Sequence, residues 1–239
     1  MEQLWKTLQE NLVFVLINIA IIAGLYLVAW LSERYLLPSK RKLSPARRVS
    51  IVGIYAAIAT VLHIFDFPLL FIAPDFYKLD FSEIPVLLCG FYLGPSATVA
   101  CEGVKILLKL LLKGTSTAFV GDFANFAVGC SFVLPAVIIY HIRKTRKNAV
   151  IGLASGTAIL TIFGSAFNAI YLLPKFAEMF IPLESILAAG AAVNSNVNSI
   201  SSFVLFCVAP LNLIKGITVS ILTMLLYKRT AKLFAPRNR

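Results

Sequence analysis

The sequence predicts an all-α membrane protein: a bundle of six transmembrane helices with one extra helix before them. Of its 239 residues, 59% are hydrophobic and only 14% are charged, whereas a soluble domain carries roughly 25% charged residues. Several apolar runs reach the length of about 20 residues that spans a lipid bilayer as a helix. Lysine and arginine give a net charge of +11 and stand in short clusters between these runs, as they do in cytoplasmic loops.

The first apolar run covers residues 12–31 and predicts a retained helix. It is too long for the core of a signal peptide, acidic residues precede it, and no small-residue cleavage site follows. A basic linker comes next. We therefore divide the chain into residues 1–46, the extra transmembrane helix with its cytoplasmic linker, and residues 47–239, a six-helix membrane domain.

The six helices of this domain are expected where apolar runs recur. Residues 66–82 between them are rich in proline, aspartate and aromatic residues and predict a loop, with room for a short extended piece. The 174–202 stretch is too polar to cross a membrane but can hold a short helix at 184–193. The expected helices are 49–72, 84–93, 95–113, 118–140, 150–173 and 203–227.

The basic clusters allow the orientation to be checked. They fall at 40–48, 141–147 and 228–239. All three lie on the cytoplasmic side only if Gly94-Pro95 is a real turn between two helices. The predicted protein is then a multi-pass protein of the cell membrane with its C-terminus in the cytoplasm and its N-terminus outside.

Two polar residues interrupt the last apolar run. Asn212 and Lys215 lie 16 and 13 positions before Lys228, which places them roughly 24 and 20 Å above it along a helix. Three positions apart, they share a helix face. Ionisable groups at such depth usually face a cavity, although helix-to-helix bonding or snorkelling is the alternative. Pro210 is expected to break this helix beside the cavity.

Other polar residues are expected at the same depth, near the ends of neighbouring helices. For three of them, helix capping or bonding between helices is as good an explanation as contact with a ligand. These three are Asp122, Asn125 and Glu83. The remaining members of this group are Asn168, Tyr171, Lys109 and Lys113.

A stripe of small residues marks one face of the 49–72 helix. Gly53, Ala57 and Thr60 recur at i, i+4 and i+7, with Ala56 and Ala59 beside them. Small residues let another helix approach closely. Spacing alone does not distinguish a partner protein from packing inside this chain.

No catalytic pattern is present in the sequence. HExxH, GxSxG and Walker A motifs are absent, and no two of the four cysteines have metal-ligand spacing. We therefore predict no enzyme, no metal and no cofactor. The scattered basic clusters also argue against nucleic-acid binding. A small membrane protein with a polar cavity and no nucleotide site suggests a binding subunit that works with partners.

The order of the motifs resembles a known family. The stretches DFSEIPVLLCGFYLGP, KGTSTAFVGDFANFAVGCSFVLPAVIIY, NAIYLLP and APLNLIKGITVSILTMLLYKR are similar to the substrate-binding S components of energy-coupling factor (ECF) vitamin transporters, the riboflavin type in particular. The resemblance covers about residues 47–229 and leaves the first helix outside the six-helix pattern. It implies a substrate-binding domain that holds a vitamin near the outer face and works with a transmembrane coupling protein and two ATPases.

The resemblance also implies roles for individual residues. Asn212, Lys215 and Asn168 match the positions that bond the flavin ring, and Gly53, Ala56 and Ala57 are similar in place to the contact with the coupling protein. The transported ligand would be riboflavin or a related flavin. The alternatives are an S component for another vitamin such as folate or pantothenate, a stand-alone facilitator, or a membrane enzyme.

Overall fold

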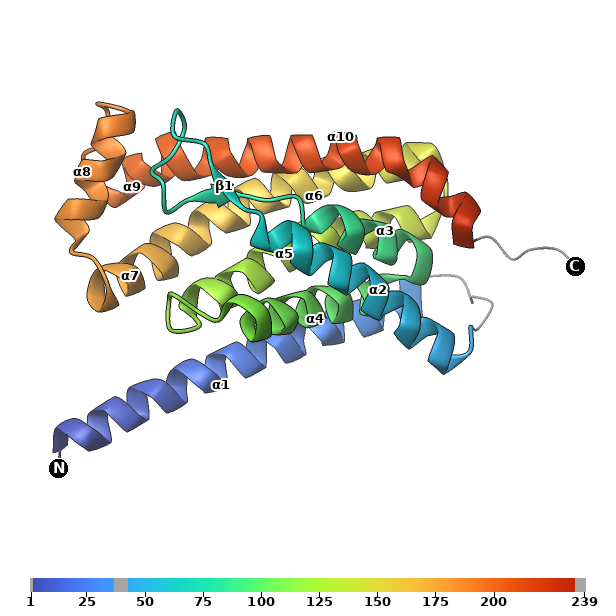
Figure 1. Ribbon diagram of the computed structural model, residues 1–239, viewed down its shortest axis with the longest axis horizontal. Coiled ribbons are helices and arrows are strands. Elements are labelled where there is room, and N and C mark those ends of the chain that lie inside the picture. The colour runs from blue at the N-terminus through green and yellow to red at the C-terminus, as the bar shows by residue number, and fades with distance from the viewer. Residues whose placement is uncertain (1, 37–42, 235–239) are drawn as a thin grey trace, which may run out of the picture.

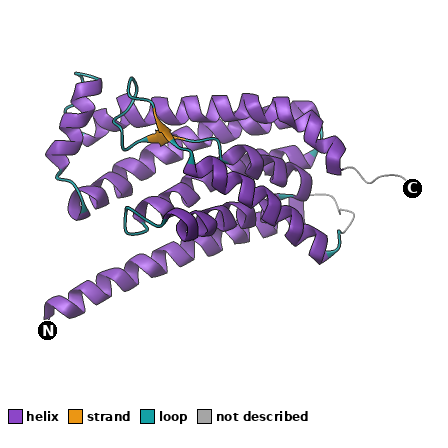
Figure 2. Ribbon diagram, in the orientation of Figure 1, coloured by secondary structure: helices purple, strands orange, loops and turns teal. Residues whose placement is uncertain are grey.

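The computed structural model describes residues 2–36 and 43–234, which form a bundle of helices with one two-stranded hairpin (Figures 1 and 2). Part of the basic clusters predicted at 40–48 and 228–239 lies outside the described residues. The principal helices are α1 (Glu2–Leu31), α2 (Pro45–Ile64), α3 (Glu83–Leu93), α4 (Pro95–Lys113), α5 (Val120–Ile142), α6 (Arg146–Phe167) and α10 (Ala209–Phe234).

The two ends of the bundle differ. At the hairpin end lie strands β1 (Phe67–Pro68) and β2 (Lys78–Leu79) with helix α8 (Leu183–Val193). The other end, which we call the basic end, carries the start of α2, the turn between α5 and α6, and the end of α10 (Figure 1). The candidate site described below lies between these ends and is joined to the hairpin through Asp80.

Four helices within the described residues are long and apolar enough to cross a membrane. They are Pro45–Ile64, Val120–Ile142, Arg146–Met179 and Ile200–Tyr227. Helix α3 has only 11 residues, and α4 carries charged side chains along its length. The predicted all-α, multi-pass architecture is confirmed.

The first helix of the domain ends earlier than expected. We expected it to reach residue 72, but α2 ends at Ile64 and the chain turns into the antiparallel pair β1–β2. Pro68 explains the difference, because proline has no N–H for a helical bond and disfavours helix at the residue before it. The extended piece expected in this loop is confirmed, as is the turn at Gly94, whose φ of 108° suits a residue without Cβ.

The two prolines expected to end or break helices do neither. Pro174 follows the π-helical segment η2 (Asn168–Leu172), and α7 (Leu173–Met179) continues the helix beyond it. Pro210 likewise follows the π-helical segment η3 (Val204–Val208), so the last helix is continuous and the predicted break was wrong. A wider turn leaves room for the ring, which would otherwise clash with the carbonyl four residues earlier.

The stripe of small residues is divided between two faces of α2. Ala56, Ala59 and Thr60 are buried in the bundle, and the Thr60 hydroxyl donates to the Lys105 carbonyl oxygen of α4 at 3.2 Å. Gly53 and Ala57 are exposed. Packing inside the chain therefore explains the small side chains at Ala56 and Thr60. Within the stripe, Gly53 and Ala57 are the residues exposed for contact with a partner.

Helix α1 packs along α4 and α5. The π-helical segment that follows it, η1 (Ser32–Leu36), is bonded to α2 and α4 at the basic end. The Glu33 carboxylate accepts a hydrogen bond from the backbone N–H of Ser96 at 3.0 Å and pairs with Arg48 at 3.8 Å. Between α1 and α4 lies a groove of about 520 Å³ lined by apolar side chains, with Ile22 and Val104 on opposite sides. Of the described residues that line it, Tyr26 is the one with a polar side-chain atom, so the groove offers little to a polar ligand.

Candidate ligand-binding site

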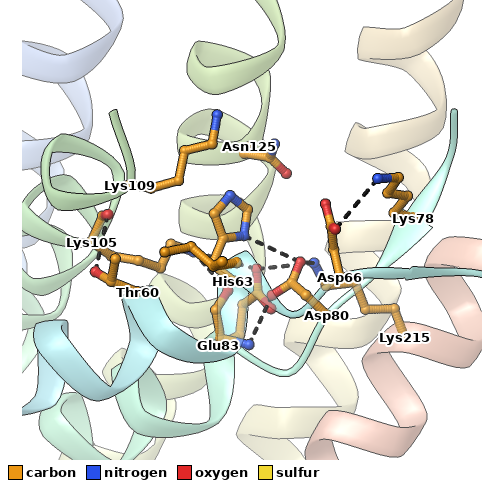
Figure 3. Close-up of polar contacts among 12 residues, drawn as sticks. Thr60, His63, Asp66, Lys78, Asp80, Glu83, Lys105, Lys109, Asn125 and Lys215 are labelled. Carbon is orange, nitrogen blue, oxygen red and sulfur yellow. Dashed lines mark hydrogen bonds and ion pairs between the residues drawn. The ribbon is translucent and has the colours of Figure 1, made fainter. Parts of the chain in front are cut away.

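A cluster of charged side chains surrounds Lys215, one of the two polar residues singled out in the last helix (Figure 3). Its ammonium group donates to Asp80 Oδ2 and to Glu83 Oε1, both at 3.1 Å. His63 Nδ1 lies 3.4 Å from the same Asp80 oxygen. Side chains from α2, α10 and the loop leading into α3 thus meet at one point.

The loop after β2 holds Asp80 and Glu83 in place. The backbone N–H of Ser82 donates to Asp80 Oδ1 at 2.8 Å, a local turn typical of aspartate before a helix. Helix α3 then begins at Glu83. Burial would raise the pKa of Asp80, but the Lys215 ammonium, and His63 after it, hold this pKa well below its ordinary value. Asp80 is therefore an anion at neutral pH.

A second ion pair lies deeper in the bundle. Lys105 of α4 donates to Glu102 and to Ser82 Oγ, the latter at 3.1 Å, and lies 3.6 Å from Glu83 Oε1. Both Lys105 and Glu102 are completely buried. The cluster therefore runs from a sealed pair on α4, through Glu83, to the more accessible Lys215.

Two asparagines lie near each other beside Gly164 of α6. Asn168 Nδ2 donates to the Gly164 carbonyl oxygen at 2.7 Å, and a Cβ placed on Gly164 would lie 2.7 Å from Asn212 Nδ2. The Asn212 Nδ2 atom is enclosed and has no hydrogen-bond partner in the described part of the chain. A buried donor without a partner is costly, so it is a natural contact for a bound molecule.

The loop before α3 contacts Asn168 and the last helix through aromatic side chains. The Tyr77 hydroxyl donates to Asn168 Oδ1 at 2.5 Å, and burial raises the pKa of this hydroxyl, which keeps it a donor. The rings of Phe76 and Phe203 are stacked at 6.5 Å between centroids. The loop is thus fixed to the last helix and to η2 over the candidate site.

Three of the predicted site residues make other contacts. Asp122 forms an ion pair with Lys109 at 2.5 Å. Asn125 is exposed, and its amide donates to the Gly121 carbonyl oxygen of its own helix. Tyr171 packs against Phe167, with 5.1 Å between ring centroids. Their role in ligand binding stays a prediction.

The structure adds four members that were not predicted as site residues: Asp80, His63, Glu102 and Lys105. The Glu102–Lys105 pair could have been predicted from the sequence, because opposite charges three positions apart within an apolar helix usually face one another. Asp80 and His63 lie in a loop and at a helix end, and their meeting with Lys215 depends on the tertiary fold.

The cluster offers hydrogen bonds rather than reactive groups. An ammonium group, an amide N–H without a partner among the described residues, and carboxylate oxygens lie within one region of apolar helices. Within residues 2–36 and 43–234, no group of three or more His, Cys, Asp or Glu side chains is placed to hold a metal ion. Such a set suits recognition of a neutral molecule with several hydrogen-bonding edges.

Comparison with known proteins identifies relatives along most of the chain. The family model described as "ECF transporter, substrate-specific component" matches residues 47–227. The riboflavin transporter RibU of Staphylococcus aureus (strain TCH60) is 35% identical over 80% of this chain and 94% of its own length. The riboflavin transporter FmnP of Bacillus subtilis (strain 168) is 29% identical over 76% of this chain and 90% of its own.

A solved structure agrees with these relatives. The S component of a bacterial ECF transporter superposes with a TM-score of 0.61 at 33% identity, covering 80% of this chain and 98% of that one. Because the relatives are transport proteins, the prediction that the chain is not an enzyme is confirmed. Helix α1 precedes the matched residues 47–227.

Proposed function

This chain belongs to the substrate-specific components of ECF transporters, and we propose that it binds riboflavin and delivers it for uptake. The proposal takes the ligand from relatives that are named riboflavin transporters. The observation that carries it in this chain is the pair on α10: an enclosed Asn212 Nδ2 atom, which has no hydrogen-bond partner among residues 2–36 and 43–234, one turn from the Lys215 ammonium.

The chemistry of riboflavin fits these groups. The pyrimidine edge of its ring system presents two carbonyl oxygens with an N–H between them, and amide and ammonium donors can pair with the oxygens. Asn168 lies close to Asn212 across Gly164, so its amide would take part after release from Tyr77. Aromatic side chains of the covering loop would exclude water from the ring.

We infer six membrane crossings, by α2, α3, α4, α5, α6 with α7, and α10, with α1 as an additional span. Basic residues gather at the basic end, which supports placing it in the cytoplasm. The N-terminus and the candidate site would then lie toward the outside. Among these basic residues are Arg47, Arg48, Arg143, Lys144, Arg146 and Lys147.

We also infer that uptake requires a transmembrane coupling protein and two ATPases, because the sequence has no Walker A motif. The exposed Gly53 and Ala57 on α2 would receive a helix of the coupling protein. Ala56 and Thr60 would support this face from inside.

Titration of riboflavin with the purified protein tests the proposed ligand. We expect saturable quenching of flavin fluorescence, with no competition from excess folate or pantothenate. Lys215→Met is the matched control and should show much weaker quenching. Binding of folate or pantothenate in place of riboflavin would show that the chain serves another vitamin.

A further inference from the structure

The two most deeply buried charges of the cluster lie directly behind the candidate site. Lys105 and Glu102 are 0% exposed, whereas the Lys215 side chain keeps 14% of its surface. Glu83 joins the two levels, because its Oε1 atom accepts from Lys215 at 3.1 Å and lies 3.6 Å from the Lys105 ammonium. One carboxylate oxygen therefore faces two cations (Figure 3).

We propose that Lys105 and Glu102 are positioning residues for ligand binding, which act on Lys215 through Glu83. This inference rests on the proposed binding of riboflavin at Lys215. An ammonium group has three N–H donors. Lys215 directs two of them to Asp80 and Glu83, so the direction of the third is set by where these two carboxylates stand.

The contacts of Lys105 show why it acts indirectly. Its ammonium is held by Glu102, by Ser82 Oγ and by Glu83. All of these partners belong to the protein, and no surface of the residue is left for a ligand. What Lys105 can do is fix the Glu83 carboxylate, from α4, at the start of α3.

A glycine on α5 provides the space for this arrangement. A Cβ on Gly129 would lie 2.3 Å from Glu102 Oε1 and 3.7 Å from Glu83 Oε1. Any side chain here would push the Glu102 carboxylate from its place without altering a charge. In contrast, a Cβ on Gly103 would meet only Phe126, at an ordinary 3.7 Å.

The loss of Lys105 alone would leave three carboxylates, Asp80, Glu83 and Glu102, around one lysine. Such a variant can fail to fold, since an unpaired buried charge is strongly destabilising. Removing Glu102 and Lys105 together keeps the net charge of the cluster, and replacing a complete buried pair is often neutral for stability. The double change therefore isolates positioning from folding.

The test compares Glu102→Gln/Lys105→Met with the wild-type protein. We expect a similar unfolding temperature without ligand, riboflavin affinity weaker by about tenfold, and a shifted absorption band of the bound flavin, because its hydrogen bond to Lys215 changes direction. A folded double variant with wild-type affinity and an unchanged band would show that the pair is structural only and would overturn the inference.

A second comparison decides the question even if the double variant does not fold. Gly129→Ala should weaken riboflavin binding several-fold and shift the flavin band, whereas Gly103→Ala should do neither. Equal binding by the two glycine variants would overturn the inference. A wild-type protein that binds no riboflavin would instead overturn the proposed function, and this inference with it.

Discussion

Asn212 and Lys215 share one face of α10 but differ in their contacts within the protein. Lys215 neutralises Asp80 and Glu83, whereas Asn212 Nδ2 has no partner among the described residues. Lys215→Met should therefore lower both riboflavin affinity and the unfolding temperature. Asn212→Ala should weaken binding by about tenfold and leave the unliganded unfolding temperature unchanged.

Fluorescence titration and thermal unfolding of the unliganded proteins measure these two effects separately. Gly103→Ala on α4 serves again as a control. If neither variant changes riboflavin affinity, the ligand lies elsewhere. If Asn212→Ala lowers the unfolding temperature of the unliganded protein as strongly as Lys215→Met does, the Asn212 amide has a structural partner.

Asp80 gives the site a defined pH dependence. Its pKa lies well below the ordinary 3.8 because Lys215 and His63 outweigh the effect of burial. A lowered folded-state pKa means that the stabilising contribution is present above pH 3.8 and is lost as the pH falls through the lowered value. Asp80→Asn should thus lower the unfolding temperature at neutral pH, and its difference from wild type should narrow below about pH 3.8.

Thermal unfolding across this pH range checks the prediction, with Asp75→Asn as a control because Asp75 is exposed in the same loop. A difference between Asp80→Asn and wild type that stays constant down to the lowest pH would contradict it.

The site residues that could be predicted from the sequence are those whose burial in an apolar segment costs free energy unless a polar partner is present. A lysine and an asparagine in the middle of an apolar run need a polar environment, and the structure gives Lys215 one. Asp80 could not be found in this way, because an aspartate in a loop is ordinary until the fold brings Lys215 to it. Asp122 looked equivalent to Glu83 in the sequence, yet Lys109 pairs with it instead.

At the level of elements, helix existence was predictable and helix ends were less so. Apolar runs indicated the helices because a bilayer demands length and hydrophobicity. Proline was expected to end a helix at Pro174 and to break one at Pro210, but at both places a π-helical turn accommodates the ring and the helix continues. Whether a proline ends a helix or is accommodated in a π-helical turn depends on the packing of neighbouring helices, which the sequence pattern does not reveal.

The exposed face of α2 is expected to be needed for coupling but not for ligand binding. Ala57→Trp should leave riboflavin affinity near wild type, because Ala57 points away from the bundle and from the candidate site. It should abolish uptake and co-purification with the coupling protein, because a bulky side chain prevents close approach of a partner helix. Titration, uptake and co-purification are measured on the same variant.

Ala158→Trp on α6 is the matched control, since Ala158 is also exposed in an apolar helix. It should retain both binding and uptake. Loss of riboflavin binding in Ala57→Trp would mean that this face supports the fold, and normal uptake would mean that no helix docks there.

At the level of the whole molecule, the candidate ligand site and the proposed coupling surface are spatially separate. The candidate site is built by α2, α3, α10, the segment η2 with Asn168, and the β1–β2 hairpin with Asp80 directly after it, and α4 lies behind the site. Gly53 and Ala57, by contrast, face outward on α2. Helix α2 belongs to both regions, because His63 near its end contacts Asp80. A partner that moves α2 would therefore also move part of the site.

This separation predicts what the chain does alone. In a host without the coupling protein and ATPases, cells producing this chain should bind riboflavin but not concentrate it. The reason is that the sequence contains no Walker A motif, so the chain alone cannot use ATP to drive transport. Co-production of the partners should restore uptake for the wild type and for Ala158→Trp, but not for Ala57→Trp. Radiolabelled riboflavin distinguishes the outcomes, since bound vitamin is limited by the number of protein molecules and accumulated vitamin is not. Concentrative, ATP-dependent uptake by this chain in the absence of partners would contradict the role of a binding subunit.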